Sequence, residues 1–85
     1  MNTLNVAVNE LKPEVKYVVE ELIQRGKTIT MVLEGDIDYD PCIDIEGGLS
    51  IVISEDGVYS LTRGENDTLE YIDEDVNLGN ILAQV

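Results

Sequence analysis

Residues 49–62 read LSIVISEDGVYSLT, and this stretch decides the fold. Two β-rich runs, residues 49–54 and 58–62, flank the tripeptide Glu55-Asp56-Gly57. An Asp-Gly pair between such runs is a strong hairpin signal, because both residues tolerate positive φ angles. The stretch therefore predicts two consecutive antiparallel strands.

Upstream of this hairpin the sequence has the period of an amphipathic helix. Pro13 suits a first helical position, where its missing N–H costs nothing, and Gly26 is a typical C-terminal stop. Between them, apolar residues recur at helical spacing: Leu11, Val15, Val18, Val19, Leu22 and Ile23. The pattern predicts a helix over residues 13–25 that packs through one apolar stripe.

Further strands are predicted on both sides of the hairpin. Four more segments each indicate a strand. They are the alternating residues 4–8, the β-rich run 27–33, the strictly alternating residues 37–45 and the run 68–72. The spacing of Leu78, Ile81, Leu82 and Val85 suits a short C-terminal helix. Strands clustered in sequence favour a meander, so residues 1–85 are expected to form a single α+β domain. It would hold a mainly antiparallel sheet of about five strands, with the helix packed on one face.

Charge is unevenly distributed along the 85 residues, which carry a formal net charge of −13. Residues 1–33 contain four acidic and four basic residues. Residues 34–85 contain fourteen acidic residues and one basic residue, Arg63, so the whole excess lies there. Such repulsion costs folding free energy. Either it serves solubility alone, or the second part of the chain presents a functional negative surface.

Residues 34–46 suggest where that surface lies. If the segment is extended, its even positions hold Glu34, the acids at 36, 38, 40, 44 and 46, and Cys42, whereas its odd positions are largely apolar. Side chains alternate faces along a strand, so the acids would form a row spaced by about 6.6 Å. A nucleic-acid strand carries one charge per about 3.4 Å of axis. Pro41 cannot donate to a ladder, so the strand is expected to lie at a sheet edge or to bend there.

The candidate partner-binding residues are this row and a second acidic cluster: Asp36, Asp38, Asp40, Asp44, Glu46, Asp73, Glu74 and Asp75. They indicate a small non-catalytic inhibitor that imitates phosphate charge and binds a basic, nucleic-acid-binding protein. An anti-restriction or anti-CRISPR protein of a phage or mobile element is of this kind. Direct binding to nucleic acid is not expected from a chain this acidic.

Metal binding and catalysis have weaker support. Asp36-x-Asp38-x-Asp40 opens like a calcium loop, but Pro41 and Gly47 stand where that loop needs Gly and Glu. The chain has no His and one Cys, whose acidic neighbours are expected to raise the thiol pKa. No metal, no cofactor and no enzymatic activity are therefore expected.

The same composition bears on location and assembly. The longest apolar run falls far short of the roughly 18 residues of a membrane span, and the N-terminus lacks the features of a signal peptide. These features, with the scarcity of cysteine, predict a cytoplasmic protein that does not contact membranes. The modest core makes a homodimer a natural supplement.

A second interpretation of the sequence starts from residues 3–33. The order strand, helix, Gly26-Lys27, strand resembles the start of the prevent-host-death antitoxins, through Val6, Val8, Glu10, Leu11, Leu22, Gly26, Lys27, Ile29 and Leu33. The resemblance implies a dimer that binds operator DNA and neutralises a toxin through a C-terminal tail. After Leu33 the sequence departs from that pattern, with acids and strands in place of a turn and helix. The alternative function is thus a plain interaction module or antitoxin-like partner, whose charge serves solubility.

Overall fold

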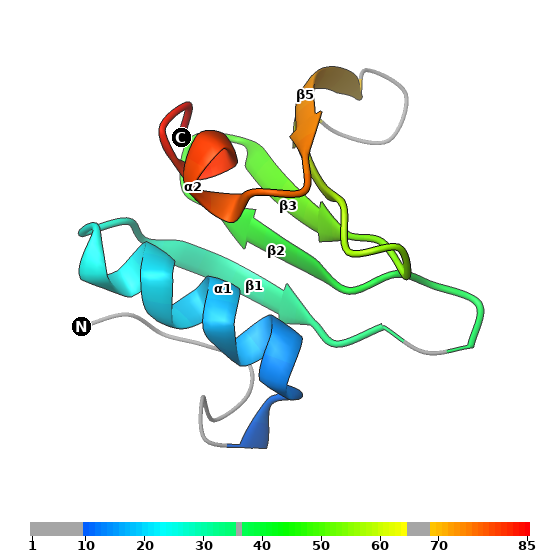
Figure 1. The fold of residues 1–85 in the computed structure, drawn as a ribbon. Coiled ribbons are helices and arrows are strands. Elements are labelled where there is room, and N and C mark those ends of the chain that lie inside the picture. The colour runs from blue at the N-terminus through cyan, green and yellow to red at the C-terminus, as the bar shows by residue number, and fades with distance from the viewer. Residues whose placement is uncertain (1–9, 36, 65–68) are drawn as a thin grey trace.

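The computed structural model describes residues 10–35, 37–64 and 69–85. Within them the chain forms an α+β fold, as predicted, in which the helices lie on one side of a five-stranded antiparallel sheet of order β1-β2-β3-β4-β5 (Figure 1). The predicted strand at residues 4–8, and Asp36, lie outside the described residues. The elements are α1 (Pro13–Gln24), β1 (Ile29–Leu33), β2 (Cys42–Ile45), β3 (Leu49–Ile53), β4 (Tyr59–Arg63), β5 (Glu70–Asp75) and α2 (Leu78–Leu82).

Helix α1 begins and ends as the sequence predicts, to within one residue. Pro13 occupies the first turn, and Arg25 is the C-cap. Gly26 has a φ of 76°, and its N–H donates to Ile23 O at 3.0 Å, whereas the N–H of Lys27 donates to Leu22 O at 3.0 Å. These two bonds form the Schellman motif, which satisfies carbonyls at the helix end and turns the chain into β1.

One hydrophobic core joins both helices to the inner face of the sheet. Four fully buried residues of α1 contribute: Val15, Val18, Val19 and Leu22. The sheet and α2 supply most of the rest: Ile29, Val32, Ile43, Ile45, Ile51, Ile53, Leu61, Leu78, Ile81 and Leu82. Burial of aliphatic side chains of this size stabilises the fold by about 1.5–3 kcal/mol each.

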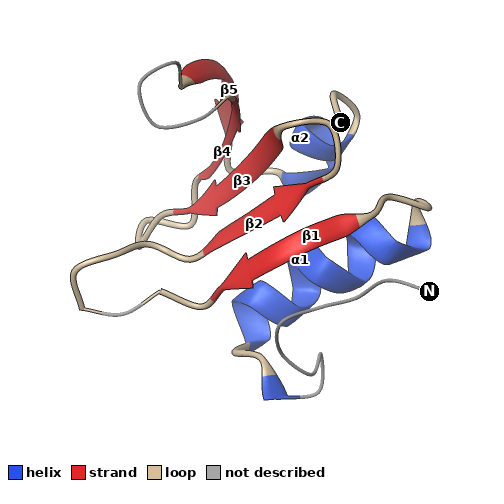
Figure 2. Cartoon of the chain, turned by 180° about the vertical axis from the view of Figure 1, so that it is seen from behind, coloured by secondary structure: helices blue, strands red, loops and turns tan. Residues whose placement is uncertain are grey.

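The other face of the sheet has no helix or strand over it in the described part of the chain (Figure 2). We call it the open face. The register of the strands aligns two cross-strand rows of side chains on it. They are Leu33–Cys42–Val52–Ser60–Glu74 and Met31–Asp44–Ser50–Thr62–Tyr71. Apolar side chains on β1 remain exposed there, with Met31 43% and Leu33 51% accessible.

The expected strand over residues 37–45 is corrected in two ways. Strand structure begins at Cys42, and residues 37–40 form a loop. Nor is the strand an edge, because β2 pairs with β1 on one side and with β3 on the other. The bend lies at residues 37–39, before Pro41. Proline has no N–H to donate, but the Pro41 carbonyl still accepts from Ile53 N at 2.9 Å.

Gly35 holds this loop closed. It has a φ of 77°, which L side chains rarely adopt, and a Cβ placed there would lie 2.6 Å from Tyr39 O and 2.7 Å from Pro41 N. The backbone at residue 35 therefore packs directly against the backbone of residues 39–41, where the loop returns to the sheet. This close approach requires glycine.

Candidate functional site

The candidate acids do not form the predicted row on one strand face. Asp38 and Asp40 are exposed in the loop, Asp44 is half-buried on the open face in β2, and Glu46 is exposed in the turn after β2. Strand β2 runs between the loop and that turn, so Asp40 and Glu46 lie at opposite ends of it. The row would have required an extended backbone over residues 34–46, whereas the chain bends at residues 37–39.

A different cluster of acids forms at one end of the sheet. The loop after β1, the start of β2 and the β3–β4 hairpin all lie at this end, because Pro41 bonds to Ile53, and Ile53 pairs with Tyr59. The described acids of these two turns are Glu34, Asp38, Asp40, Glu55 and Asp56, and we call this group the acidic end. The sequence reasoning did not select Glu34, Glu55 or Asp56. The Glu55-Asp56-Gly57 turn was a usable signal, since a tight hairpin must lie at a sheet end.

Basic residues are sparse at this end. Lys12, just before α1, is the base that lines a hollow shared with Glu34 and Asp40. Arg63 pairs with Leu49 and Glu70 at the other end of β4, and Arg25 and Lys27 follow the far end of α1. The helix-side hollow at this end thus has Lys12 among the carboxylates of Glu14, Glu34, Asp40 and Glu55.

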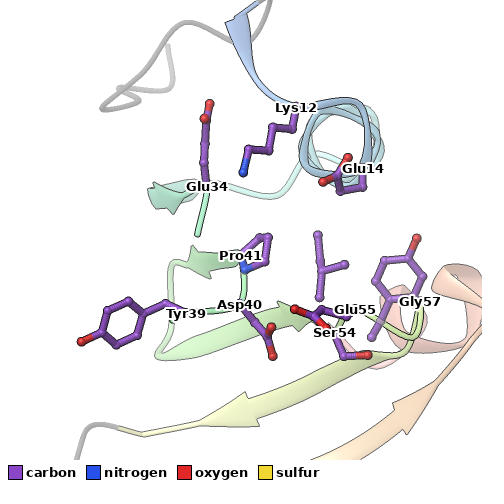
Figure 3. Close-up of a pocket in the computed structure, with 11 residues that line it drawn as sticks. Lys12, Glu14, Glu34, Tyr39, Asp40, Pro41, Ser54, Glu55 and Gly57 are labelled. Atoms are coloured by element: carbon purple, nitrogen blue, oxygen red, sulfur yellow. The ribbon is translucent and has the colours of Figure 1, made fainter. Parts of the chain in front are cut away.

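Two hollows flank the loop of residues 34–41, one on each side of the sheet. The helix-side hollow has a volume of about 350 Å³. Its lining includes Lys12, Glu14, Glu55 and Tyr59. In Figure 3 the Lys12 side chain extends from the start of α1 into the space above Pro41, beside Glu34.

The open-face hollow is larger, at about 580 Å³. It is lined by Leu33, Glu34, Gly35, Asp38, Tyr39, Asp40, Cys42 and Val52. Leu33, Cys42 and Val52 are neighbours in one cross-strand row and form its floor. Glu34, Tyr39 and Asp40 border both hollows, so the loop is the wall between them.

The second predicted cluster, Asp73, Glu74 and Asp75, lies within strand β5 rather than after it. Register puts Asp73 and Asp75 on the helix side, opposite Leu61 and Tyr59, and Glu74 on the open face, opposite Ser60. The cluster is therefore divided between the two faces, as alternation along a strand requires.

Two of these acids have structural contacts with the C-terminal segment. Asp73 accepts from Gln84 Nε2 at 2.6 Å. Asp75 accepts from Asn77 N at 2.8 Å and from Asn80 Nδ2 at 2.9 Å, and the bond from the Asn77 N–H is the main reason that the Asp75 pKa lies below its usual value. Both carboxylates therefore join β5 to the C-terminal segment that contains α2.

Asp44 and Cys42 are coupled on the open face. Ser50 Oγ donates to Asp44 Oδ1 at 2.8 Å, and Cys42 Sγ lies 3.5 Å from the same oxygen. Burial, followed by the charge of Asp44, raises the pKa of the Cys42 thiol to about 11. The thiol is therefore protonated at neutral pH, as expected from its acidic neighbours, and is a poor nucleophile.

No group of three or more potential metal ligands occurs in the described ranges 10–35, 37–64 and 69–85. In those ranges no helix has the length and apolar character needed to cross a bilayer.

Comparison with known proteins gives no relative. No family model, no curated protein and no solved structure matches the chain. The resemblance of residues 3–33 to the prevent-host-death antitoxins thus has no support from the family models.

Proposed function

We propose that this protein is a cytoplasmic, non-catalytic inhibitor that binds a basic, nucleic-acid-binding protein by imitating phosphate charge. Its surface for that partner is the acidic end, in place of the strand row first expected. The observation that carries the proposal is the gathering of Glu34, Asp38, Asp40, Glu55 and Asp56 at one end of the sheet, with Lys12 as the neighbouring base.

The placement of the acids favours binding over simple solubility. A charge that serves solubility has no reason to concentrate at one end of a sheet, where mutual repulsion is largest. Asp38, Asp40, Glu55 and Asp56 are all exposed, and they come from two separate turns. A partner with a phosphate-binding groove would attract this end over a Debye length of about 8–10 Å.

The targets that reward such a surface have deep basic grooves: restriction or CRISPR nucleases, polymerases and nucleoid proteins. A phage or mobile element would gain from a small stoichiometric blocker of these proteins. Each contact would be a partly exposed ion pair worth little alone, so single substitutions are expected to weaken binding slightly and combined ones strongly.

The test is capture of partners on immobilised protein at about 0.1 M and about 1 M salt, where the Debye length falls from about 10 Å to about 3 Å. We expect captured proteins that normally bind nucleic acid, release at high salt, and competition by DNA. Capture of proteins without nucleic-acid-binding activity would contradict the proposal.

A matched pair of variants separates the surface from net charge. One carries Asp38→Asn, Asp40→Asn, Glu55→Gln and Asp56→Asn, and the other carries Glu20→Gln, Glu21→Gln, Glu46→Gln and Glu70→Gln. Each removes four negative charges from the −13 total and so leaves −9. We expect the first variant to lose the partner and the second to keep most of the binding. Equal binding by both variants would show that position does not matter.

The alternative function is that of a plain protein-interaction module, such as an antitoxin-like partner protein or a homodimer. The exposed apolar side chains on the open face favour it, among them Leu33, which is 51% accessible, and Tyr71, which is 69% accessible. In that case partner binding would barely change between low and high salt. Size-exclusion chromatography distinguishes a homodimer from a binary complex.

A further inference from the structure

The open-face hollow has two kinds of lining. Leu33, Cys42 and Val52 give it a floor of low polarity, and Tyr39 also lines it. The carboxylates of Glu34 and Asp40 border the same space. Its volume of about 580 Å³ lies within the roughly 300–1,000 Å³ range of ligand-binding hollows, which is ample for a long side chain and water.

The two hollows differ in whether this chain supplies a cation. Lys12 lines the helix-side hollow together with Glu34 and Asp40. The open-face hollow borders the same two carboxylates, yet no basic residue lines it in the described part of the chain. Charge complementarity therefore points to a cation that comes from another molecule on this side of the loop.

We propose that the open-face hollow receives an arginine side chain from the partner protein. The inference rests on the proposed function and names the contact at its centre. The aliphatic stem of arginine would cover Leu33 and Val52, as long basic side chains do on apolar surfaces. Its guanidinium would reach the carboxylates at the rim, where two parallel hydrogen bonds to one carboxylate are available.

Arginine fits this lining better than lysine. A guanidinium is planar, more weakly hydrated than an ammonium and able to stack on an aromatic ring such as that of Tyr39. Lysine carries a compact, strongly hydrated charge that loses more on entering a space with an apolar floor. The hollow would thus select among basic partners, whereas the surrounding acids attract them all.

The test is an NMR titration of the full chain with two capped peptides, Gly-Arg-Gly-Arg-Gly and Gly-Lys-Gly-Lys-Gly. We expect the arginine peptide to bind roughly five- to tenfold more tightly, because it adds stacking and bidentate hydrogen bonds. The shifted amides should be those of Leu33, Cys42 and Val52. Equal affinity for the two peptides, or shifts confined to other parts of the chain, would overturn the inference.

A pair of exposed leucines supplies the control. Leu33 is 51% accessible and lies in the floor, whereas Leu69 is 54% accessible and precedes β5. Leu33→Ala is expected to abolish the preference for arginine, and Leu69→Ala to preserve it. A preference that survives Leu33→Ala would contradict the assignment of the floor.

These outcomes separate the two proposals. Salt-sensitive capture of a nucleic-acid-binding partner, with no difference between the peptides, would overturn the arginine site and leave the proposed function standing. Selective binding of the arginine peptide, together with partners that never bind nucleic acid, would overturn the proposed function and leave the arginine site standing.

Discussion

The helix-covered face and the acidic end of this molecule are built from the same strands but by different physics. The covered face contains fully buried aliphatic residues, among them Val19 of α1, Ile51 of β3 and Leu61 of β4. The acidic end consists of exposed carboxylates in two turns, and none of its five acids is buried. The covered face therefore supplies packing and the acidic end supplies exposed charge, so each can be altered while the other is measured.

The largest expected effect comes from placing a charge in the covered face. Val19→Asp puts an unpaired carboxylate at a position that is 0% accessible, so we expect a cost of more than about 4 kcal/mol and loss of the folded state. Circular dichroism at 25 °C and during heating measures it. Glu20→Asp, on the exposed side of the same helix, controls for the helix propensity of aspartate and should stay folded. A cooperative thermal transition in Val19→Asp would show that this face is not the core.

The next effect should disturb the acidic end and spare the core. Gly35→Ala forces a Cβ to within 2.6 Å of Tyr39 O at a φ of 77°. Gly48→Ala also has a positive φ, 85°, but its Cβ meets nothing within 4 Å. We expect Gly48→Ala to cost about 1–2 kcal/mol from its φ alone.

For Gly35→Ala we expect a further loss of about 1–3 kcal/mol from overpacking. Urea unfolding measures both costs. The difference should be accompanied by loss of arginine-peptide binding in Gly35→Ala alone. Equal stability of the two variants would mean that the loop can open without cost.

A smaller effect concerns the reactivity of Cys42, which lies on the open face at the start of β2. A rise of the thiol pKa from 9.0 to about 11 leaves roughly 100-fold less thiolate at pH 8 than in the unfolded chain. Alkylation by iodoacetamide should therefore be roughly 10–100-fold slower in the native protein than in urea. Because the thiol has a higher pKa in the folded protein than in the unfolded chain, protonation of Cys42 favours the folded state. This stabilising contribution is complete below pH 9 and is lost as pH rises towards 11.

The control for this prediction is Asp44→Asn. It removes the second cause of the raised pKa and should speed alkylation, although burial still protects the thiol. Alkylation of the native protein as fast as in urea would contradict the coupling of Cys42 to Asp44.

The smallest effect separates acids that hold structure from acids that only carry charge. The Asp75 pKa is lowered from 3.8, first by the hydrogen bond from the Asn77 N–H and then by Asn80. Its stabilising contribution is therefore present above about pH 3.8 and is lost as pH falls through the lower folded value. An NMR titration of the Asp75 carboxyl should give a midpoint below 3.8. A midpoint at or above 3.8 would mean that β5 and α2 are not joined through this carboxylate.

Local signals account for most of the predicted fold. The Asp56-Gly57 pair specified the hairpin, and Pro13 and Gly26 marked the ends of α1, because these residues act through their own backbone conformation. Alternation succeeded at Ile43 and Ile45, which are buried, and was misleading at Ile37, which is 96% accessible in the loop. A period of two describes any extended backbone, so the pattern by itself does not separate a paired strand from a loop.

The sequence alone determined that the chain is acidic, that the excess lies after residue 33, and that strands follow a helix. Tertiary structure decided which acids meet. Glu55 and Asp56 lie at the same end of the sheet as Asp40 because β2 pairs with β3, and Lys12 lies there because α1 starts at this end. Pairing and packing depend on the burial of one face by segments far apart in sequence, and residue spacing does not encode such long-range contacts.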